Sequence, residues 1–392
     1  MPPQPLSISV LFEYPTLNGG ERSMLSVMDV LRPQGVDFTV LAPDTGPLSR
    51  ELDQREINRH ALDMFDRSGQ RRSRATLVER VVEFADTSGA DVVHANSLSM
   101  SRVLGASAAA IDVPCCGHLR DIVKLSRAAV GDLNGNTRLL AVSQATRSFH
   151  IQQGVDPQRL RVIYNGVDCS VFKPRDGDGA LRRELDIGSR DLLVLHIGQI
   201  SLRKAQDVYV EAAIRCIMEC PQMHFVLVGE RHSQKSESIE FEQSLRRRID
   251  AAGVNHRFHR LGRRDDIAQL MNSCDILVHT SRQEPLGRVL LEAGASGLPI
   301  VATHVGGTSE IFPDESSAII VAADDPAAIR STLVRLADNP CLRQRLAAGA
   351  RQRVCDHFEV QRSAGALRSC WESLISGQSS VGKSDAPSEG LL

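Results

Sequence analysis

Two glutamates, Glu284 and Glu292, stand eight positions apart in the stretch SRQEPLGRVLLEAGASGLP near the end of the chain. Proline suits the first helical position and glycine suits the left-handed residue after a helix end. Pro285 and Gly297 therefore predict a helix from about 285 to 296. Such a helix would separate the two carboxylates by about 12 Å along its axis.

The start of this predicted helix is a candidate anion site. The amides of Leu286, Gly287 and Arg288 would lack partners within the helix and would lie at the positive end of its dipole, where phosphate binds well. Glu292 could then accept hydrogen bonds from both hydroxyls of a ribose, while Glu284 would lie where a group is transferred. The alternative is that Glu284 is an acid of the kind common at helix starts and that Glu292 is solvated.

Basic residues at another strand end are predicted to line the opposite side of the same site. The stretch VLHIGQISLRKAQDVYVEA runs from a strand through a glycine turn into a helix, and it places Arg203 and Lys204 at the turn. Cations at this place would clamp a diphosphate. Taken alone, an Arg-Lys pair is usually solvated surface.

The first half of the chain has candidates of its own. Gly19 and Gly20 open a helix after the first predicted strand and would let a ligand approach the backbone. His118 and Arg120 follow another strand in VPCCGHLRDIV; a lone histidine is more often packed or solvated than catalytic, but this one lies at a strand end. Asn165 begins an Asn-Gly turn, which by itself is structural.

A repeated alternation of strands and helices must position these residues. Short runs rich in valine, isoleucine and leucine, such as SISVLF, DVVHAN and RLLAVS, precede longer helix-period stretches, which is typical of a parallel sheet covered on both faces. After the glycine- and charge-rich break at 173–191 the pattern restarts with LLVLHIG, HFVLVG and PIVAT. We predict an α/β fold of two doubly wound domains, 1–185 and 186–357, with ligands beyond the carboxyl ends of the strands. A helical segment at about 358–375 fits either domain, and the polar, aperiodic tail 376–392 is predicted to be disordered.

Composition excludes several classes of protein. The formal net charge of -2 over 392 residues lacks the basicity of a nucleic-acid binder, so we expect no nucleic acid partner. Nine cysteines without a C-x-x-C pair argue against a disulfide framework and favour a cytoplasmic location. We expect neither a signal peptide nor a membrane span. No G-x-G-x-x-G follows the first strands, no P-loop is present, and His256 with His259 lacks further metal ligands.

Taken together and in this order, these residues resemble the retaining nucleotide-sugar glycosyltransferases of family 4, which have the GT-B fold. The resemblance runs from about residue 7 to residue 375. Its most specific parts are RVIYNGVDCSVFKP and EPLGRVLLEAGASGLPIVATHVGGTSEI, and it is supported by NGGER, AVSQATR and GQISLRKA. The resemblance implies two Rossmann-like domains facing across a cleft, the first for the acceptor and the second for the nucleotide sugar. It also implies that the C-terminal helix around Trp371 crosses back to the first domain.

The resemblance implies a role for each matching residue. The catalytic set is His118 beside the transferred sugar, Arg203 and Lys204 on the diphosphate leaving group, and Glu284 on the hexose. Glu292 would hold the ribose, Gly19 and Gly20 would border the acceptor and phosphate, and Gly262 and Arg263 would lie near the base. The full substrate-binding set is Gly19, Gly20, Arg120, Asn165, Gly262, Arg263, Pro285, Leu286, Gly287, Arg288 and Glu292.

Two departures from the family pattern are visible. Gln199 stands where many relatives carry arginine after the glycine, so one phosphate contact is lost or is taken over by Arg203. Leu286 stands where phenylalanine is common, which alters the expected hexose pocket.

The resemblance implies transfer of a hexose from a nucleotide diphosphate sugar to a hydroxyl of a carbohydrate or lipid-linked acceptor, in glycan, glycolipid or polysaccharide biosynthesis, with no metal and no further cofactor. Fixed cations and helix amides would stabilise the leaving phosphate. The sequence offers no compelling carboxylate nucleophile beside His118, so we favour attack from the same face, with the leaving phosphate accepting a proton.

Two other functions stay open at this point, a nucleotide-sugar 2-epimerase of the same fold and a noncatalytic nucleotide-sugar-binding subunit. The residues do not distinguish UDP, GDP and ADP. The basic stretch RSGQRRSRATLVER could contact an anionic membrane, although a solvated loop is the better interpretation. Its arginines are Arg67, Arg71, Arg72, Arg74 and Arg80.

Overall fold

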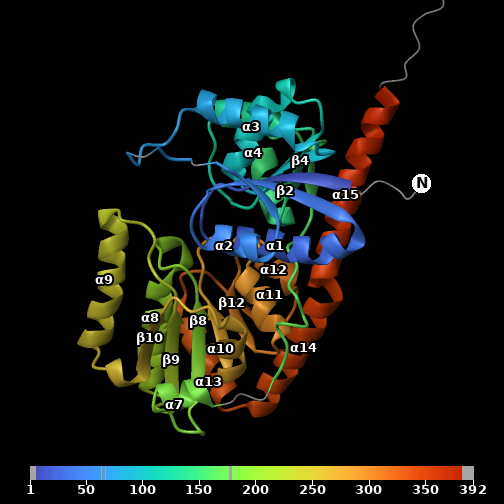
Figure 1. The fold of residues 1–392 in the computed structure, drawn as a ribbon. Coiled ribbons are helices and arrows are strands. Elements are labelled where there is room, and N and C mark those ends of the chain that lie inside the picture. The colour runs from blue at the N-terminus through green and yellow to red at the C-terminus, as the bar shows by residue number, and fades with distance from the viewer. Residues whose placement is uncertain (1–5, 63, 67, 176–178, 382–392) are drawn as a thin grey trace, which may run out of the picture. The chain divides into compact units, whose positions relative to one another are not determined.

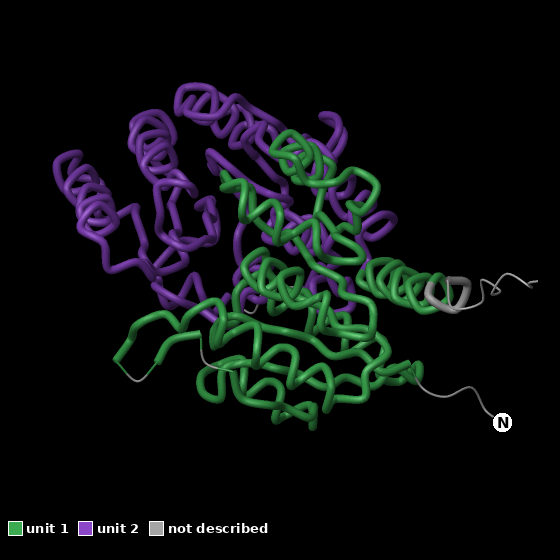
Figure 2. Tube along the Cα trace, turned by 90° about the horizontal axis from the view of Figure 1, so that it is seen from above, with its two compact units in different colours: residues 1–164, 360–392 green, residues 165–359 purple. Residues whose placement is uncertain are grey.

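The structure, a computed structural model, describes residues 6–62, 64–66, 68–175 and 179–381 (Figure 1). The chain forms two compact units (Figure 2). Unit 1 comprises residues 1–164 and 360–392, and unit 2 comprises residues 165–359.

Unit 1 is built on a seven-stranded parallel sheet with the strand order β3-β2-β1-β4-β5-β6-β7. Its strands are β1 (Leu6–Leu11), β2 (Val36–Ala42), β3 (Asn58–Ala61), β4 (Val92–Ala95), β5 (Cys115–Leu119), β6 (Arg138–Ala141) and β7 (Leu160–Val162). Its helices are α1 (Gly19–Leu31), α2 (Pro47–Gln54), α3 (Arg74–Ser88), α4 (Leu98–Ser107), α5 (Arg127–Asn134), α6 (Gln144–Gln152) and α15 (Val360–Val381).

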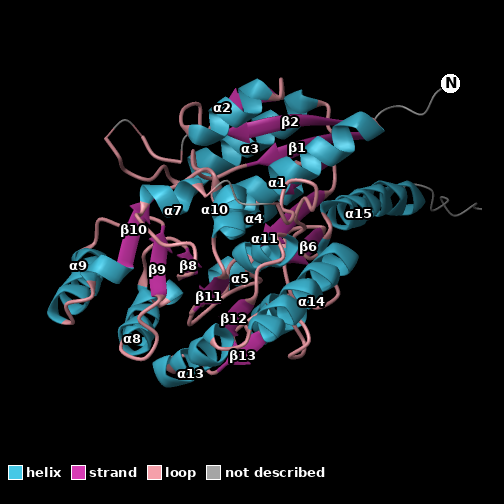
Figure 3. Ribbon diagram, turned by 90° about the horizontal axis from the view of Figure 1, so that it is seen from below, coloured by secondary structure: helices cyan, strands magenta, loops and turns pink. Residues whose placement is uncertain are grey.

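Helices cover both faces of this sheet (Figure 3). Successive side chains of a strand point to opposite faces. Ile8 and Val10 of β1 accordingly pack in the cluster that includes α1 and α15, whereas Leu11 joins the cluster of α3 and α4. The α15 contribution includes Leu367 and the fully buried Trp371, four positions apart on one helix face.

Unit 2 is built on a six-stranded parallel sheet with the order β10-β9-β8-β11-β12-β13. Its strands are β8 (Leu192–Ile197), β9 (Met223–Val228), β10 (Phe258–Gly262), β11 (Ile276–His279), β12 (Ile300–Thr303) and β13 (Ile319–Val321). Its helices are α7 (Ala180–Glu184), α8 (Gln206–Ile217), α9 (Ser236–Ala251), α10 (Ile267–Ser273), α11 (Arg288–Ala295), α12 (Thr308–Ile311), α13 (Pro326–Ala337) and α14 (Pro340–Phe358). Every residue of β8 and β9 is buried, as expected for parallel strands covered on both faces.

The division between the units lies at residues 164 and 165, about twenty residues before the position 185 predicted from the sequence. The reason is that the connecting segment is fastened to unit 2. The amide of Val167 donates to the Phe358 carbonyl (2.9 Å), and that of Arg175 donates to the Asn272 side chain (2.7 Å). The glycine- and charge-rich break is thus part of unit 2.

The C-terminal helix belongs to unit 1. It continues to Val381, so residues 376–381 are helical, whereas the sequence pattern predicts disorder from 376. Small and polar residues can extend a helix whose earlier turns are anchored by buried side chains, because propagation costs less than nucleation. The rest of the predicted tail, 382–392, lies outside the described residues. No helix among the described residues is both long enough and apolar enough to cross a membrane.

Candidate active site

The strand order reverses once in each sheet, between β1 and β4 in unit 1 and between β8 and β11 in unit 2. Open parallel sheets bind ligands at such reversals, beyond the carboxyl ends of the strands. In unit 2 the segment after β8 contains a 3-10 turn, Leu202–Lys204, and the segment after β11 contains Glu284. The two segments follow neighbouring strands, so the topology places their side chains close together.

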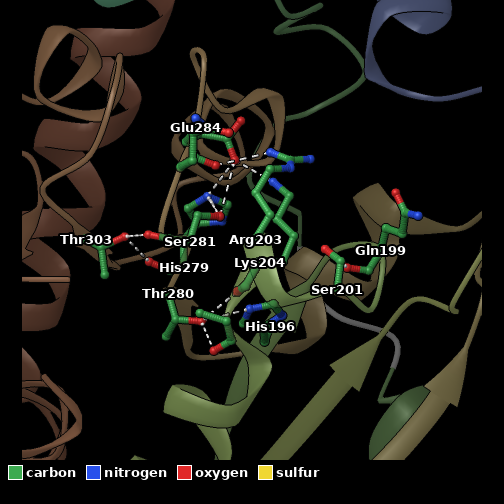
Figure 4. Close-up of polar contacts among 12 residues, drawn as sticks. His196, Gln199, Ser201, Arg203, Lys204, His279, Thr280, Ser281, Glu284 and Thr303 are labelled. Atoms are coloured by element: carbon green, nitrogen blue, oxygen red, sulfur yellow. Dashed lines mark hydrogen bonds and ion pairs between the residues drawn. The ribbon is translucent and has the colours of Figure 1, made fainter. Parts of the chain in front are cut away.

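Glu284 is the centre of a buried polar network (Figure 4). Its Oε2 forms an ion pair with the Lys204 ammonium and lies 3.0 Å from Nε2 of His279 and 3.3 Å from the hydroxyl of Ser281. Burial alone would raise the pKa of Glu284, but the Lys204 charge and the His279 contact outweigh burial and hold that pKa well below its ordinary value. Glu284 is therefore an ionised carboxylate in a nearly dry site.

Other side chains fix the two segments to each other. The Thr303 hydroxyl donates to the Ser281 carbonyl (2.6 Å), and the Thr280 hydroxyl donates to the Ala205 carbonyl (2.9 Å). His196 lies within hydrogen-bond distance of that Thr280 hydroxyl (3.2 Å). These supporting residues are not among the candidates predicted from the sequence. The available signal was polar residues at the carboxyl ends of otherwise apolar strands.

Arg203 lies beside the same carboxylate segment. Its guanidinium donates to the Gln283 carbonyl (3.1 Å), and its own carbonyl accepts from the Arg282 amide (2.8 Å). The structure thus brings Arg203, Lys204 and Glu284 together, as their strand-end positions predicted.

The helix after Glu284 begins later than predicted. α11 starts at Arg288 instead of 285, because Gly287 has a left-handed φ of 104° that is incompatible with a helical position. Pro285 and Leu286 therefore precede the helix, its first amide is that of Arg288, and the helical spacing of about 12 Å between the two glutamates does not apply. A Cβ on Gly287 would lie 2.8 Å from Leu290, so glycine is required for close packing as well.

Two glycines support the loop that carries Glu284. A Cβ on Gly306 would lie 1.8 Å from the Glu284 carbonyl oxygen, and the Gly307 amide donates to that oxygen (3.1 Å). The glycine pair after β12 thus allows the backbone to approach the loop that carries Glu284. At the other end of α11, Gly297 has the predicted left-handed conformation (φ 70°).

Glu292 is buried on α11, not solvated as the alternative held. Its Oε1 accepts a hydrogen bond from Nε of Arg288 one helical turn earlier (2.6 Å). Such a pair one turn apart lies on one helix face. Glu284 is also no ordinary helix-start acid, because Gly287 occupies the N-cap position of α11.

The predicted base-contacting turn lies at the carboxyl ends of β9 and β10. Gly262 has a φ of 64°, and its carbonyl accepts from the Gly229 amide (2.8 Å). Both glycines line a cavity of about 350 Å³, together with Glu230 and Glu242 among others. Arg263 is exposed and directly follows Gly262, one of the residues that line this cavity.

In unit 1, Asn96 connects three of the predicted residues at the reversal between β1 and β4. Its side-chain amide donates to the Gly20 carbonyl (3.1 Å), and its side-chain oxygen accepts from Nη2 of Arg120 (2.8 Å). Arg120 in turn lies 3.2 Å from Nδ1 of His118. Gly19 is the first residue of α1. Asn96 is not among the residues predicted from the sequence; its signal was a polar residue directly after an apolar strand.

His118 is buried, with 2% of its surface exposed. Burial lowers the pKa of its imidazole, as do Arg120 and His94, so the ring is neutral near pH 7. Asn165 is the first residue of unit 2, whereas His118 and Arg120 belong to unit 1.

A buried carboxylate that the sequence analysis did not single out, Glu13, also lies beyond β1. It accepts a hydrogen bond from Ser97 (3.0 Å) and pairs with Arg71 at 3.5 Å. The other described arginines of the basic stretch also have partners inside unit 1: Arg74 pairs with Asp132, Arg80 with Glu83, and Arg72 donates its amide to the Met64 carbonyl. Arg67 lies outside the described residues. Within the described residues there is no group of three or more His, Cys, Asp or Glu side chains arranged for a metal ion.

Comparisons with known proteins agree with this geometry. Residues 17–171 match the family model described as Glycosyltransferase Family 4, and residues 178–353 match Glycosyl transferases group 1. A D-inositol 3-phosphate glycosyltransferase from Frankia alni is 30% identical over 302 residues, which are 71% of this chain and 73% of that protein. The chain belongs to the family 4, group 1 glycosyltransferases.

Other relatives of this chain are matched over less of their length. A D-inositol 3-phosphate glycosyltransferase from Thermomonospora curvata is 34% identical over 226 residues, 55% of this chain and 52% of that protein. The chain spans about half the length of several such relatives. The crystal structure of Anabaena HepE in complex with UDP is 26% identical, with a TM-score of 0.82 over 94% of this chain and 100% of HepE. The two parallel-sheet units are therefore the two Rossmann-like domains of the GT-B fold.

Proposed function

We propose that this glycosyltransferase moves a hexose from a nucleoside diphosphate sugar to a hydroxyl group of a carbohydrate or lipid-linked acceptor in the cytoplasm, with retention of the anomeric configuration, in glycan, glycolipid or polysaccharide biosynthesis. The observation that carries the proposal is the buried pairing of Lys204 with Glu284 at the strand reversal of unit 2, with Arg203 beside it. The UDP bound by HepE supports a nucleoside diphosphate as the ligand of this kind of site.

The donor half of the proposal assigns roles to the groups around that pair. Arg203 and Lys204 face the diphosphate, where their positive charge compensates the phosphates. Arg288 holds one oxygen of Glu292, which orients this buried carboxylate toward the two hydroxyls of a ribose. Glu284 accepts a hydrogen bond from a hydroxyl of the hexose, while the Lys204 ammonium turns toward the phosphate. Gly262 and Arg263 border the base, next to the cavity at the ends of β9 and β10.

The chemical step needs stabilisation of charge. As the bond between sugar and diphosphate breaks, negative charge grows on the phosphate oxygen and positive charge grows on the sugar carbon. Cations held in place before the reaction lower this barrier because they need no reorganisation. Arg203 and Lys204 supply that charge, so the proposal includes no metal ion. The acceptor hydroxyl attacks from the face that the phosphate leaves, and a phosphate oxygen takes its proton.

The acceptor half of the proposal rests on unit 1. Gly20, Asn96 and Arg120 form a hydrogen-bonded cluster beyond β1 and β4, where the acceptor is expected to bind. The proposal includes no membrane contact, since Arg71, Arg74 and Arg80 engage acidic side chains of their own unit.

The test starts from ligand binding. UDP, GDP, ADP and their hexose conjugates are screened by thermal shift, because a ligand of the native state raises the melting temperature. The stabilising donor is then incubated with candidate acceptors, and the anomeric coupling of the first product is read by NMR. A product with inverted configuration would overturn the retaining mechanism. Isomerisation of the donor without any acceptor would identify an epimerase instead, and binding without turnover would indicate a noncatalytic subunit.

A further inference from the structure

Two cysteine side chains of unit 2 are in contact although they lie 186 positions apart in the sequence. The sulfur atoms of Cys169 and Cys355 are 3.0 Å apart, and both side chains are free thiols. A disulfide bond needs a sulfur–sulfur distance of about 2.05 Å, so the two atoms would have to approach by about 1 Å. Rotation about the side-chain bonds is sufficient for a movement of that size.

Backbone contacts hold the two cysteines in this position. The amide of Cys169 donates to the Glu359 carboxylate (3.1 Å), and the amide of Val167 donates to the Phe358 carbonyl (2.9 Å). Cys355 lies in the last turn of α14, which is anchored by the buried side chain of Phe358. The contact between the sulfur atoms therefore follows from the packing of the connecting segment against the end of α14.

Exposure distinguishes this pair from a second pair of neighbouring cysteines. Cys169 and Cys355 are both partly exposed. Cys116 of β5 is hydrogen-bonded to Cys370 of α15, but Cys116 is fully buried. Oxidation by a small molecule from solvent therefore favours the pair in unit 2.

We infer that Cys169 and Cys355 are a reversible oxidation site, which a low-molecular-weight disulfide such as oxidised glutathione converts to a disulfide bond between the connecting segment and α14. The chain enters unit 2 at Asn165 and leaves it at Glu359, so the bond joins the segments next to both crossings. Disulfides in cytoplasmic proteins are mostly transient and redox-sensing. The inference goes beyond the proposed function and does not depend on the sugar, the nucleotide or the acceptor.

The oxidation takes place in two exchange steps. The Cys355 thiolate attacks one sulfur of oxidised glutathione, which forms a mixed disulfide and releases one glutathione thiolate. The Cys169 thiolate then attacks the Cys355 sulfur of the mixed disulfide, which closes the protein disulfide and releases the second glutathione. Two cysteine thiols are thereby oxidised, one glutathione disulfide is reduced to two thiols, and the two cysteine protons pass to the released thiolates. Burial and the neighbouring Glu359 carboxylate raise the pKa of the Cys169 thiol, so the first attack is assigned to Cys355.

Peptide mapping tests the site directly. The full chain is equilibrated with mixtures of reduced and oxidised glutathione, alkylated, digested and analysed by mass spectrometry without reduction. A cross-linked pair of peptides that contains Cys169 and Cys355 is expected, and it should disappear after treatment with dithiothreitol. C370S removes the partner of Cys116 and is expected to leave this cross-link unchanged. A wild type that forms no bond between Cys169 and Cys355 in excess oxidised glutathione would overturn the inference.

Two serine variants test the order of the steps. C169S keeps the attacking thiol and is expected to accumulate glutathione on Cys355. C355S keeps only the thiol with the raised pKa, so glutathione is expected to add to Cys169 at least about tenfold more slowly. Peptide mapping separates both adducts from one on the exposed Cys341. Equal rates in the two variants would refute the assigned order of attack.

The disulfide should also stabilise unit 2 without affecting unit 1, because a bond that closes so long a loop restricts the unfolded chain. On oxidation, hydrogen exchange of the most protected amides in β8 and β11 is expected to slow by about 100-fold, with no change in β1 and β4. C169S/C355S in the same buffer is the matched control and is expected to show no slowing. Equal exchange rates in oxidised wild type and oxidised C169S/C355S would contradict a bond that holds the connecting segment on α14. None of these measurements uses a nucleotide sugar, so failure of the proposed function would leave them unchanged.

Discussion

Replacing Lys204 with methionine should separate two effects of its ion pair with Glu284, one on the stability of unit 2 and one on kcat. The side chains are 12% and 8% exposed, so the pair is buried. Removing one partner of a buried pair leaves an uncompensated charge and costs about 3 to 5 kcal/mol. The contacts of His279 and Ser281 remain, which places the expected loss near the lower figure. In the proposed function the Lys204 charge also faces the leaving phosphate, so kcat should fall by about 100-fold.

Hydrogen exchange is the suitable measurement, because a chain of two units need not unfold in one step. A loss of about 3 kcal/mol should accelerate exchange of the most protected amides in β8 and β11 by about 100-fold, with unit 1 unchanged. Arg203→Met is the matched control. Arg203 is exposed and donates to a backbone carbonyl, so its loss should lower kcat with a change in stability of about 1 kcal/mol or less.

A second variant and the pH dependence sharpen the test. K204M/E284M replaces both charges by apolar groups, which often restores stability, so it should be more stable than K204M while staying inactive. The depressed pKa of Glu284 means that its contribution in the wild type is present above about pH 4.5 and is lost as the pH falls further. The difference between wild type and K204M should therefore narrow in acid. Equal stability of K204M and R203M at pH 7 would refute the reasoning.

Three further outcomes are expected. Glu292→Ala should raise the donor KM about 10- to 100-fold with little change in kcat, since ribose binding is shared by ground and transition states; unchanged donor affinity in calorimetry would exclude the ribose role. The free energy of unfolding should fall by about 2 kcal/mol from pH 7 to pH 5, because the pKa of His94 is about 3 in the folded state, whereas in the unfolded chain it is at the ordinary value of 6.5 and the ring takes up a proton. Denaturant titration of the wild type and of H94Q at pH 7 and at pH 5 measures this cost. Gly306→Ala should disturb the Glu284 carbonyl and abolish transfer, whereas Gly365→Ala, with open space around it, should be neutral or stabilising by circular dichroism melting.

Local rules were enough to predict much of the architecture. Runs of buried aliphatic residues followed by helix-period stretches predicted two parallel sheets, because strand and helix periodicities are properties of short segments. The positive φ of Gly297 could be predicted for the same reason, since it depends on the end of one helix. Strand-end positions also predicted that Arg203 and Lys204 would meet Glu284, because neighbouring parallel strands end at one edge.

Other features depend on segments far apart in the sequence. α11 starts at Arg288 because Gly287 has a left-handed conformation. The space that a side chain at position 287 would need is filled by Leu290 and by Glu284. The unit boundary is set by hydrogen bonds between the connecting segment and the end of α14. No local pattern contains those contacts.

The amino-acid sequence by itself thus determined which residue types lie at the ends of which strands. Only the tertiary structure decided their charge states and partners. Glu284 is held ionised by Lys204, 80 residues earlier in the chain, and Arg120, which lies beside the neutral ring of His118, is held by Asn96, 24 residues earlier. A periodic pattern indicates which face of an element is covered, but not which charge covers it.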